Sequence, residues 1–255
     1  MSNTLSSSRT PSQTYRDSLL GVTCATTVIG GWIATLWWTF HLDPHQLPIW
    51  AIALLFLLRT FQHTGLFITA HDAMHGSACP ANSQINRAIG TIAITLYALL
   101  PYNFLCEQHG KHHDRPATDD DPDYCRKHQD NAVLWYLDFM FKYMKYRGSW
   151  LQLVAMTAIF HFLWYFCGVP LENVLFFWGL PTILSSVQMF YFGVFLTHRE
   201  PPEGFDNIHR ARSSYYSILW SFVTCYHFGY HLEHHQYPHL PWYKLPYAVD
   251  RAKLT

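Results

Sequence analysis

The chain has 255 residues, which is enough for one large domain or two small ones. Half of the residues are hydrophobic and only 13% are charged, well below the roughly 25% of an ordinary soluble domain. The formal net charge is zero, which gives no reason to expect nucleic acid as a partner. Because 17 histidines accompany the apolar stretches, the composition predicts membrane spans that carry a polar, histidine-rich cap.

The N-terminal region is rich in Ser and Thr, and it lacks the charged start, short apolar core and cleavage site of a signal peptide. We expect residues 1–18 to form a disordered cytoplasmic tail and residues 19–255 to form a single membrane domain. The six cysteines include no CxxC pair, so neither a disulfide framework nor a thiolate metal site is indicated.

Four apolar stretches are long enough to cross about 30 Å of hydrocarbon, which takes roughly 20 helical residues. They cover residues 19–40, 48–70, 150–167 and 171–197. Short links that contain Pro or Gly join the first pair and the second pair, so each pair is predicted to form a helical hairpin. Residues 86–105 and 215–230 are also apolar, and they fit a span, a re-entrant segment or an interfacial helix.

Lysine and arginine predict the orientation of the spans. Neither hairpin link contains one, whereas residues 106–149 hold seven and the region after residue 198 holds six. Positive residues favour the cytoplasmic side, so both termini and the histidine-rich regions are expected there. Only Arg59 lies within a predicted span, where snorkelling or an internal ion pair would stabilise it. The predicted fold class is all-α and integral to the membrane, with four transmembrane helices in two hairpins, interfacial or re-entrant helices, and a cytoplasmic di-metal cap.

Histidines concentrate in three short windows at the expected cytoplasmic ends. The windows cover 15 residues and hold eight of the 17 histidines, where random placement would put one. On a helix, positions i, i+3 and i+4 share one face, about 5–6 Å apart. Each window therefore points two or three imidazoles at one place. The candidate ligands from these windows are His71 and His75, then His109, His112 and His113, and finally His231, His234 and His235.

Eight imidazoles are more than one ion uses, so two metal ions are indicated. The alternative, a set of hydrogen-bonded polar residues at the interface, is disfavoured because clustered buried imidazoles are costly without metal. Imidazole suits Zn, Cu, Fe and Ni, so the ligand type does not choose the metal. Zinc hydrolysis normally needs three ligands and an open position, which makes a hydrolase the weaker interpretation. The metalloprotease, P-loop, dinucleotide-binding and serine-hydrolase motifs are absent from the sequence.

The three windows and the two hairpins resemble the membrane fatty-acid desaturase and hydroxylase superfamily of di-iron enzymes. The residues around them are more specific. "LFITAHDAMHGS" (66–77), "NFLCEQHGKHHDRPATDDDPDY" (103–124), "FYFGVFLTHREP" (190–201) and "TCYHFGYHLEHHQYPHLPW" (224–242) resemble the bacterial β-carotene ketolases, or carotenoid 4,4′-oxygenases. The likeness covers nearly all of residues 50–250. Acyl-CoA desaturases place an Asn where this chain has Val194, so an acyl substrate fits less well.

The resemblance implies a further ligand at the end of the fourth span, which is His198 here. His227 lies one turn before His231, where it fits a ligand, an acceptor beside the ligands or a substrate contact. Carboxylates near the windows are natural acceptors for ligand N–H groups, whereas Asp119 and Asp120 are expected in a solvated loop. The candidate acceptors are Asp72, Asp114, Asp121 and Glu233.

The remaining histidines are given structural roles. His63 lies about 12 Å along its helix from His71, from a rise of 1.5 Å per residue, so we expect hydrogen bonding inside the bundle. His161 is expected to be a satisfied polar group in the bundle interior. The loop or surface histidines are predicted to be His41, His45, His128, His209 and His239.

The resemblance implies that β-carotene is converted through echinenone to canthaxanthin. Two hydroxylations of the C4 methylene of a β-ionone ring, followed by loss of water, would give each ketone, and no catalytic residue is implied beyond the metal centre. The implied cofactors are two Fe, which overexpression can replace with Zn, together with O₂. No haem, flavin or Fe–S motif occurs in the sequence, so external electrons are needed, and a ferredoxin on the basic cytoplasmic surface is the expected donor.

Two rival functions remain at this point. A carotenoid hydroxylase or a fatty-acyl desaturase would use the same metal site on another carbon or chain. A membrane metal carrier or sensor would need ligands along a transmembrane path, and here the ligands gather at one end. The expected setting is a bacterial inner membrane or a thylakoid-type membrane, with the carotenoid substrate dissolved in the lipid bilayer.

Overall fold

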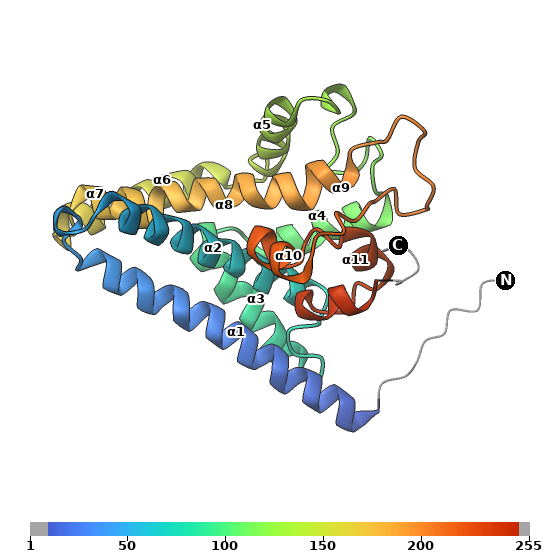
Figure 1. Cartoon of the computed structure of the whole chain (residues 1–255), viewed down its shortest axis with the longest axis horizontal. Coiled ribbons are helices and arrows are strands. Elements are labelled where there is room, and N and C mark those ends of the chain that lie inside the picture. Colours follow the sequence, from blue (N-terminus) through green and yellow to red (C-terminus); the bar gives the residue numbers. More distant parts are fainter. Residues whose placement is uncertain (1–9, 250–255) are drawn as a thin grey trace.

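The computed structural model describes residues 10–249, and every regular element in that range is a helix (Figure 1). Within it, four helices are long and apolar enough to span a membrane: α1 (Pro11–Phe40), α2 (Ile49–Met74), a third over Ser149–Phe166 and a fourth over Leu171–His198. The third consists of α6 (Ser149–His161) and η3 (Phe162–Phe166). The fourth consists of α7 (Leu171–Val174), η4 (Leu175–Gly179), α8 (Leu180–Phe190), η5 (Tyr191–Phe195) and α9 (Leu196–His198). The predicted all-helical membrane fold with four spans is confirmed.

Helix α1 begins earlier than the sequence predicted. The tail was expected to reach residue 18; residues 1–9 of it lie outside the described residues, and from Pro11 onward the chain is helical. The reason is a capping box at Thr10. The backbone N–H of Gln13 donates to Thr10 Oγ1 at 3.3 Å, and the Thr10 N–H donates to Gln13 Oε1 at 2.9 Å. Pro11 at the first helical position favours the same start.

The four spans form two hairpins whose turns lie at one end of the molecule, toward the left of Figure 1. The first turn contains the short helix η1 (Pro44–Gln46), and the second contains Gly168 with a φ of +68°, a conformation that glycine adopts without strain. Figure 1 also places α4, α9 and α11 toward the opposite end, where the histidine windows meet.

The apolar segment after the first hairpin is a bent pair of helices. Helices α3 (Ser83–Ala98) and α4 (Tyr102–Asp114) meet at 98° across a short break. Leu99 adopts a left-handed conformation there, and Pro101 precedes α4, so the first helix cannot continue in a straight line. The sequence left this segment open between a span, a re-entrant segment and an interfacial helix, and in the structure it is a pair of helices bent by 98°.

Arg59 joins three of the spanning helices in the bundle interior. Its side chain is 1% exposed and donates to the carbonyl oxygens of Trp32 in α1 at 2.8 Å and Phe177 in η4 at 3.0 Å. It also donates to Thr35 Oγ1 at 2.6 Å. The predicted snorkelling or ion pair is therefore wrong: the guanidinium is held by carbonyl and side-chain oxygens, and no carboxylate within residues 10–249 forms an ion pair with it.

Smaller helices cover the end of the bundle that holds the histidines. They are η2 (Arg126–His128), α5 (Ala132–Tyr143), α10 (Ile218–Cys225), α11 (His231–Gln236) and η6 (Trp242–Tyr247). Helix α10 has eight residues, too few to span, so the apolar segment 215–230 is not a span. Figure 1 shows α5 standing across α8 rather than along it. Helix α6 differs from the other spans because none of its residues is buried.

Candidate metal centre

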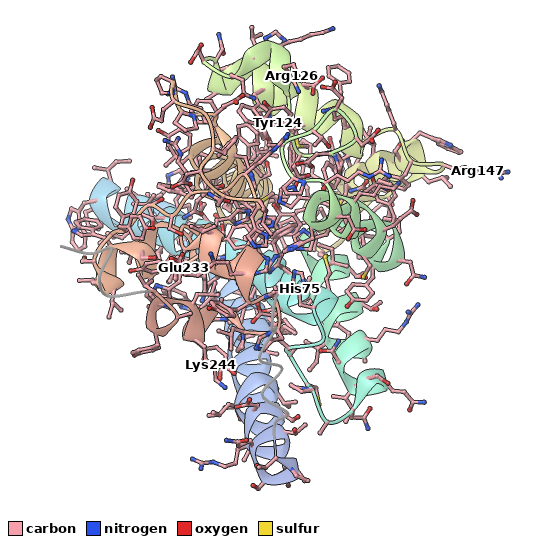
Figure 2. All side chains as sticks on the ribbon, turned by 90° about the vertical axis from the view of Figure 1, so that its right-hand side faces the viewer. His75, Tyr124, Arg126, Arg147, Glu233 and Lys244 are labelled. Atoms are coloured by element: carbon pink, nitrogen blue, oxygen red, sulfur yellow. The ribbon has the colours of Figure 1, made fainter. Side chains whose placement is uncertain are left out.

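Four helices deliver the predicted ligands to one place. His71 lies in the last turn of α2, with His75 directly after the helix, and the second histidine window lies in the last turns of α4. His198 ends α9, and the third window forms most of α11. Helices α4 and α11 carry their histidines at i, i+3 and i+4, so each presents its imidazoles on one face. In Figure 2, which faces this end of the molecule, His75 lies near the centre.

The imidazoles form two groups of four. Cluster A consists of His71, His75, His109 and His234, and cluster B of His112, His198, His231 and His235; in each cluster one ligand atom per residue lies within 4.8 Å of the others. In cluster A, the Nε2 atoms of His75 and His109 are 2.7 Å apart. In cluster B, His235 Nε2 is 3.1 Å from His112 Nε2 and 3.2 Å from His231 Nε2.

His113 lies between the clusters and is the ninth predicted ligand. Its Nε2 is 3.1 Å from His109 Nε2 and 3.0 Å from His234 Nε2, both in cluster A. Its ring also stacks on His235 of cluster B, with 4.3 Å between ring centroids. The structure therefore brings together all nine histidines that the sequence predicted as ligands, in an arrangement with a place for two ions.

The nitrogen atoms at the centre of each cluster suit metal ions better than mutual hydrogen bonds. A neutral imidazole carries one N–H, so nitrogens that converge from several rings cannot all be paired with one another. The Nε2 atoms of His71 and His198 are buried without a hydrogen-bond partner. The pKa values of His231, His234 and His235 are well below the usual value for histidine. The main cause is the burial of the rings, and the second cause is the other histidines beside them. Neutral imidazoles with free lone pairs are the form that binds metal.

Two ligands are oriented by acceptors behind them. His112 Nδ1 lies 3.0 Å from both carboxylate oxygens of Asp121. His198 Nδ1 lies 2.8 Å from the carbonyl oxygen of Arg210. Because each acceptor receives a hydrogen bond from the Nδ1–H group, the Nε2 lone pair of each ring faces cluster B. Burial alone would raise the pKa of Asp121, but His112 and the Asp123 N–H outweigh it, and the net shift is downward.

Asp123 and Tyr143 extend this contact, and neither was among the residues predicted for the site. Asp123 Oδ2 lies 3.7 Å from His112 Nδ1, and the Tyr143 hydroxyl donates to Asp123 Oδ1 at 2.6 Å. Burial raises the pKa of Asp123 to about 6. The available signal was the i, i+2 spacing from Asp121, which puts both carboxylates on one turn beside a buried histidine. Asp119 and Asp120, as expected, are exposed and pair with Arg126 and Arg115.

The other predicted acceptors do not bond to a ligand. Asp72 Oδ1 is 3.8 Å from His71 Nδ1, beyond hydrogen-bond range, and Asp72 Oδ2 accepts from the Trp242 N–H at 3.2 Å. Glu233 accepts from the Ser213 hydroxyl, because two residues beyond His231 its side chain leaves the opposite side of α11. Asp114 is exposed at the end of α4. His227 stacks on Trp242, with 5.9 Å between ring centroids, because a left-handed turn at Tyr226 and His227 directs it there.

Three further histidines were predicted to have structural roles, and their surroundings can be compared with those predictions. His63 behaves as predicted, since it accepts from Trp32 Nε1 at 3.1 Å and contacts the Tyr97 carbonyl oxygen at 2.8 Å. His161 was expected inside the bundle, but it is exposed on α6, where it forms a hydrogen bond with the Thr157 carbonyl oxygen of its own helix. His209 is closer to the site than a surface residue would be, with its ring centroid 5.9 Å from that of His235.

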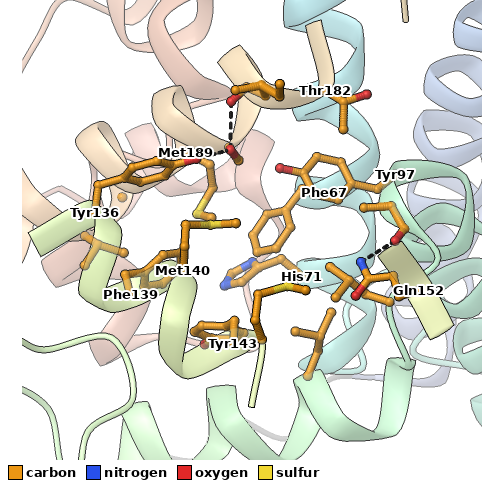
Figure 3. Close-up of a pocket in the computed structure, with 18 of the residues that line it drawn as sticks. Phe67, His71, Tyr97, Tyr136, Phe139, Met140, Tyr143, Gln152, Thr182 and Met189 are labelled. Atoms are coloured by element: carbon orange, nitrogen blue, oxygen red, sulfur yellow. Dashed lines mark hydrogen bonds between the residues drawn. The ribbon is translucent and has the colours of Figure 1, made fainter. Parts of the chain in front are cut away.

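A cavity of about 590 Å³ reaches both clusters from inside the bundle. Two imidazoles of cluster A, His71 and His109, and two of cluster B, His112 and His231, form part of its wall. Figure 3 shows His71 pointing into the cavity beside Phe67 and Met140. The wall is mostly apolar, and its volume is within the range of small-molecule pockets. The arrangement can hold an apolar molecule against a pair of metal ions.

Comparison with known proteins defines the class. The profile of the fatty acid desaturase family matches residues 47–254, which include all nine histidines. The chain therefore belongs to the fatty acid desaturase family. No solved structure matches the chain.

The individual relatives narrow the likeness to ketolases. A β-carotene ketolase of Paracoccus sp. (strain N81106 / MBIC 01143) is 40% identical over 232 residues, which cover 88% of this chain and 92% of the relative. A β-carotene 4-ketolase 3 of Haematococcus lacustris is 36% identical, with 89% of this chain and 78% of the relative covered. A zeaxanthin 4-ketolase of Chlamydomonas reinhardtii is 36% identical, with 93% and 55% covered. The chain is a homologue of these β-carotene ketolases.

Proposed function

We propose that this protein is an O₂-dependent oxygenase that converts the C4 methylene of β-ionone rings to a ketone. The observation that carries the proposal is the apolar cavity that ends on two clusters of four imidazoles. The names of the relatives supply the carotenoid and the position of the oxidation. Two iron ions held by the clusters would supply the activation of O₂ that an unreactive C–H bond requires.

The proposed reaction consists of two hydroxylations and one dehydration. Each hydroxylation consumes one O₂, two electrons and two protons, places one hydroxyl on C4 and releases one water. A second hydroxylation at the same carbon gives a gem-diol, which loses water to form the ketone. The residues of this chain hold the ring against the clusters and exclude bulk water, while Asp121 and the Arg210 carbonyl keep the Nδ1 protons away from the metal side.

Three hydroxyl groups in the cavity wall, those of Tyr136, Thr182 and Ser186, support a hydrocarbon substrate, because their hydrogens are used within the protein. Ser186 donates to the Ile183 carbonyl oxygen at 2.7 Å, so the Tyr136 hydroxyl, 2.7 Å from Ser186 Oγ, is the donor to it. Thr182 donates to the Trp178 carbonyl oxygen at 2.8 Å. Figure 3 shows the Tyr136 contact at the edge of the cavity. A polyene without polar groups leaves none of these donors unpaired.

Electrons are proposed to come from a ferredoxin-type carrier that docks at the histidine end. Exposed cations there support the proposal, and Figure 2 shows Arg126 and Arg147 at the periphery of this end. Opposite charge would steer an acidic carrier to this surface. We propose the same end as the cytoplasmic one, because the hairpin turns at the other end carry no Lys or Arg.

Expression in cells that accumulate β-carotene tests the function directly. Pigment analysis should detect a product with one 4-keto ring, followed by a product with two. A 3-hydroxylated product would indicate a carotenoid hydroxylase instead. Unchanged pigment together with new double bonds in membrane lipids would indicate an acyl desaturase.

The metal role of His198 is tested separately from the product. His198→Ala should lose ketone formation and metal content together, because its Nε2 is buried in cluster B. His161→Ala is the matched control, since it also removes a histidine from a spanning helix but from an exposed position. Metal per protein and ketone yield are measured for both variants. Two metals retained in His198→Ala would show that the other eight imidazoles suffice.

A further inference from the structure

The cavity that ends on the histidine clusters is exposed at one place in its wall. Its exposed lining residues are Leu153 and Thr157 of α6 and Ile183 of α8, whereas the others are buried or half-buried. Leu153 is 57% exposed and Ile183 is 60% exposed. The opening of the cavity is therefore between two spanning helices, and none of these three residues comes from the loops at the histidine end.

The opening lies at mid-depth of both spans. Ile183 is twelve residues after the start of its span at Leu171, about 18 Å at 1.5 Å per residue. Thr157 is eight residues after the start of the third span at Ser149, about 12 Å by the same rise. Each position is within the hydrocarbon core of a bilayer about 30 Å thick. The opening consequently faces lipid tails rather than water.

The packing of α6 explains why the bundle is open there. No residue of α6 is buried, and its large side chains Trp150, Leu151 and Val154 are each more than half exposed. By contrast, α2 and α8 are in extensive contact with each other and form the closed side of the cavity. Helix α6 is thus a wall with lipid on one side and the cavity on the other.

Helix α5 closes the cavity toward the histidine end. Tyr136, Phe139, Met140 and Tyr143 share one face of α5 at helical spacing and line the cavity, as Figure 3 shows. The Tyr136 hydroxyl bonds to Ser186 of α8, which fixes α5 across the span. Access from water at this end would require α5 to leave that contact.

We propose that the substrate reaches the clusters from within the bilayer, through the opening between α6 and α8 at Leu153, Thr157 and Ile183. The inference rests on the proposed function, since a carotenoid dissolves in the hydrocarbon core and not in water. One ring passes through the opening to the clusters, and the rest of the polyene extends back between the two helices toward the lipid.

Bulky substitutions at the opening test the route. Thr157→Trp and Ile183→Trp should lose most of the ketone yield in β-carotene-producing cells, because an indole fills the passage. Val154→Trp and Leu184→Trp are matched controls on the same helices, exposed but outside the cavity wall, and they should keep the yield. Metal per protein and the β-carotene that copurifies with each variant are measured in parallel. The blocked variants should keep the metal and lose the bound pigment.

A smaller side chain at the opening provides a second test, in case the bulky variants misfold. Ile183→Ala widens the opening and should keep or raise the ketone yield. The proposal is overturned if Thr157→Trp and Ile183→Trp match their controls in yield and bound pigment, or if Ile183→Ala alone abolishes the yield while keeping the metal. Failure of the proposed function is distinguishable, because the unsubstituted protein would then form no ketone at all.

Discussion

At His112 and His198, the ring nitrogen that faces away from cluster B is held by an oxygen atom of the protein. Asp121 is the acceptor for His112, and the Arg210 carbonyl is the acceptor for His198. These contacts select the tautomer, so the other nitrogen presents a lone pair to the cluster. Asp121 in turn accepts the backbone N–H of Ala117 at 2.8 Å and that of Asp123 at 2.8 Å, which fixes the carboxylate itself. The ligand geometry therefore depends on the loop after α4 as well as on the histidines.

Asp121→Asn should weaken metal binding without removing a ligand. The amide keeps one acceptor oxygen but loses the negative charge that supports the His112 N–H, and such changes cost about 10–100-fold in metal affinity. Metal affinity is measured by competition with a chelator. Asp119→Asn, in the same loop but exposed and paired with Arg126, should bind metal like the unsubstituted protein. Equal affinities in the two variants would show that Asp121 does not support the site.

The clustered histidines could be identified from the sequence, whereas their surroundings could be predicted only in part. The i, i+3, i+4 spacing survives in any helix, so His109, His112 and His113 could be recognised as one face without coordinates. Asp121 was among the predicted acceptors, but Asp123 was not, and both reach His112 because the loop after α4 folds back. His161 was misplaced for a related reason: an apolar span does not reveal which of its faces meets lipid.

Within the fourth span, a π-helical turn at η5 adjusts the register just before His198. The turn includes Gly193, which lies against the ring of Phe228. Phe228 packs against His71 with 4.7 Å between ring centroids and against His231 with 5.2 Å. Single π turns are frequent at functional sites, because they re-aim the residues that follow. The position of η5 therefore affects both clusters, because Phe228 lies between Gly193 and the imidazoles of His71 and His231.

Gly193→Ala should disturb both clusters through Phe228. A Cβ at this position would clash with Phe228 Cδ1, and that ring is 4% exposed, so it would have to shift within the packing that includes His71 and His231. Overpacking of this kind costs about 1–3 kcal/mol of stability. The midpoint temperature of thermal unfolding, the metal content and the ketone yield should all decrease.

Gly30→Ala in α1 is the control for the glycine change itself, because an added Cβ there meets nothing within 4 Å. It should be neutral or stabilising, since Ala is favoured over Gly in a helix by about 1 kcal/mol. In the double variant Gly193→Ala/Phe228→Leu, the smaller side chain should restore part of the metal content. If Gly193→Ala behaves like Gly30→Ala, the contact with Phe228 does not position the clusters.

The long elements were predictable because hydrophobic length alone identifies a span, and the four predicted stretches overlap the four observed helices. The short elements were not. The bend between α3 and α4 depends on a left-handed Leu99 followed two residues later by Pro101. The apolar pattern alone was consistent with a span, a re-entrant segment or an interfacial helix. Helix α5, which forms part of the cavity wall, contains charged and apolar residues together and gave no signal of its role.

For the molecule as a whole, the fold places all nine candidate ligands at one end. Cluster A takes His71 and His75 from the first hairpin, cluster B takes His198 from the second, and α4 and α11 contribute histidines to both clusters. The cavity enters from the bundle side, and Arg126 lies exposed at the periphery of the histidine end. An apolar substrate and a water-soluble electron carrier would therefore reach the centre from opposite directions.

That division requires the histidine end to be cytoplasmic, and cysteine labelling from outside the cell tests it. Cys167 is an exposed cysteine beside the second hairpin turn, so a membrane-impermeant maleimide should label the unsubstituted protein in intact bacterial spheroplasts. Cys167→Ser should remove this labelling. In the Cys167→Ser background, His45→Cys in the first hairpin turn should restore it, because His45 has a side chain that is 83% exposed. Arg126→Cys, 63% exposed at the histidine end, should react only after the cells are lysed. Labelling of Arg126→Cys in intact spheroplasts, with His45→Cys protected, would invert the topology and place the electron donor on the wrong side of the membrane.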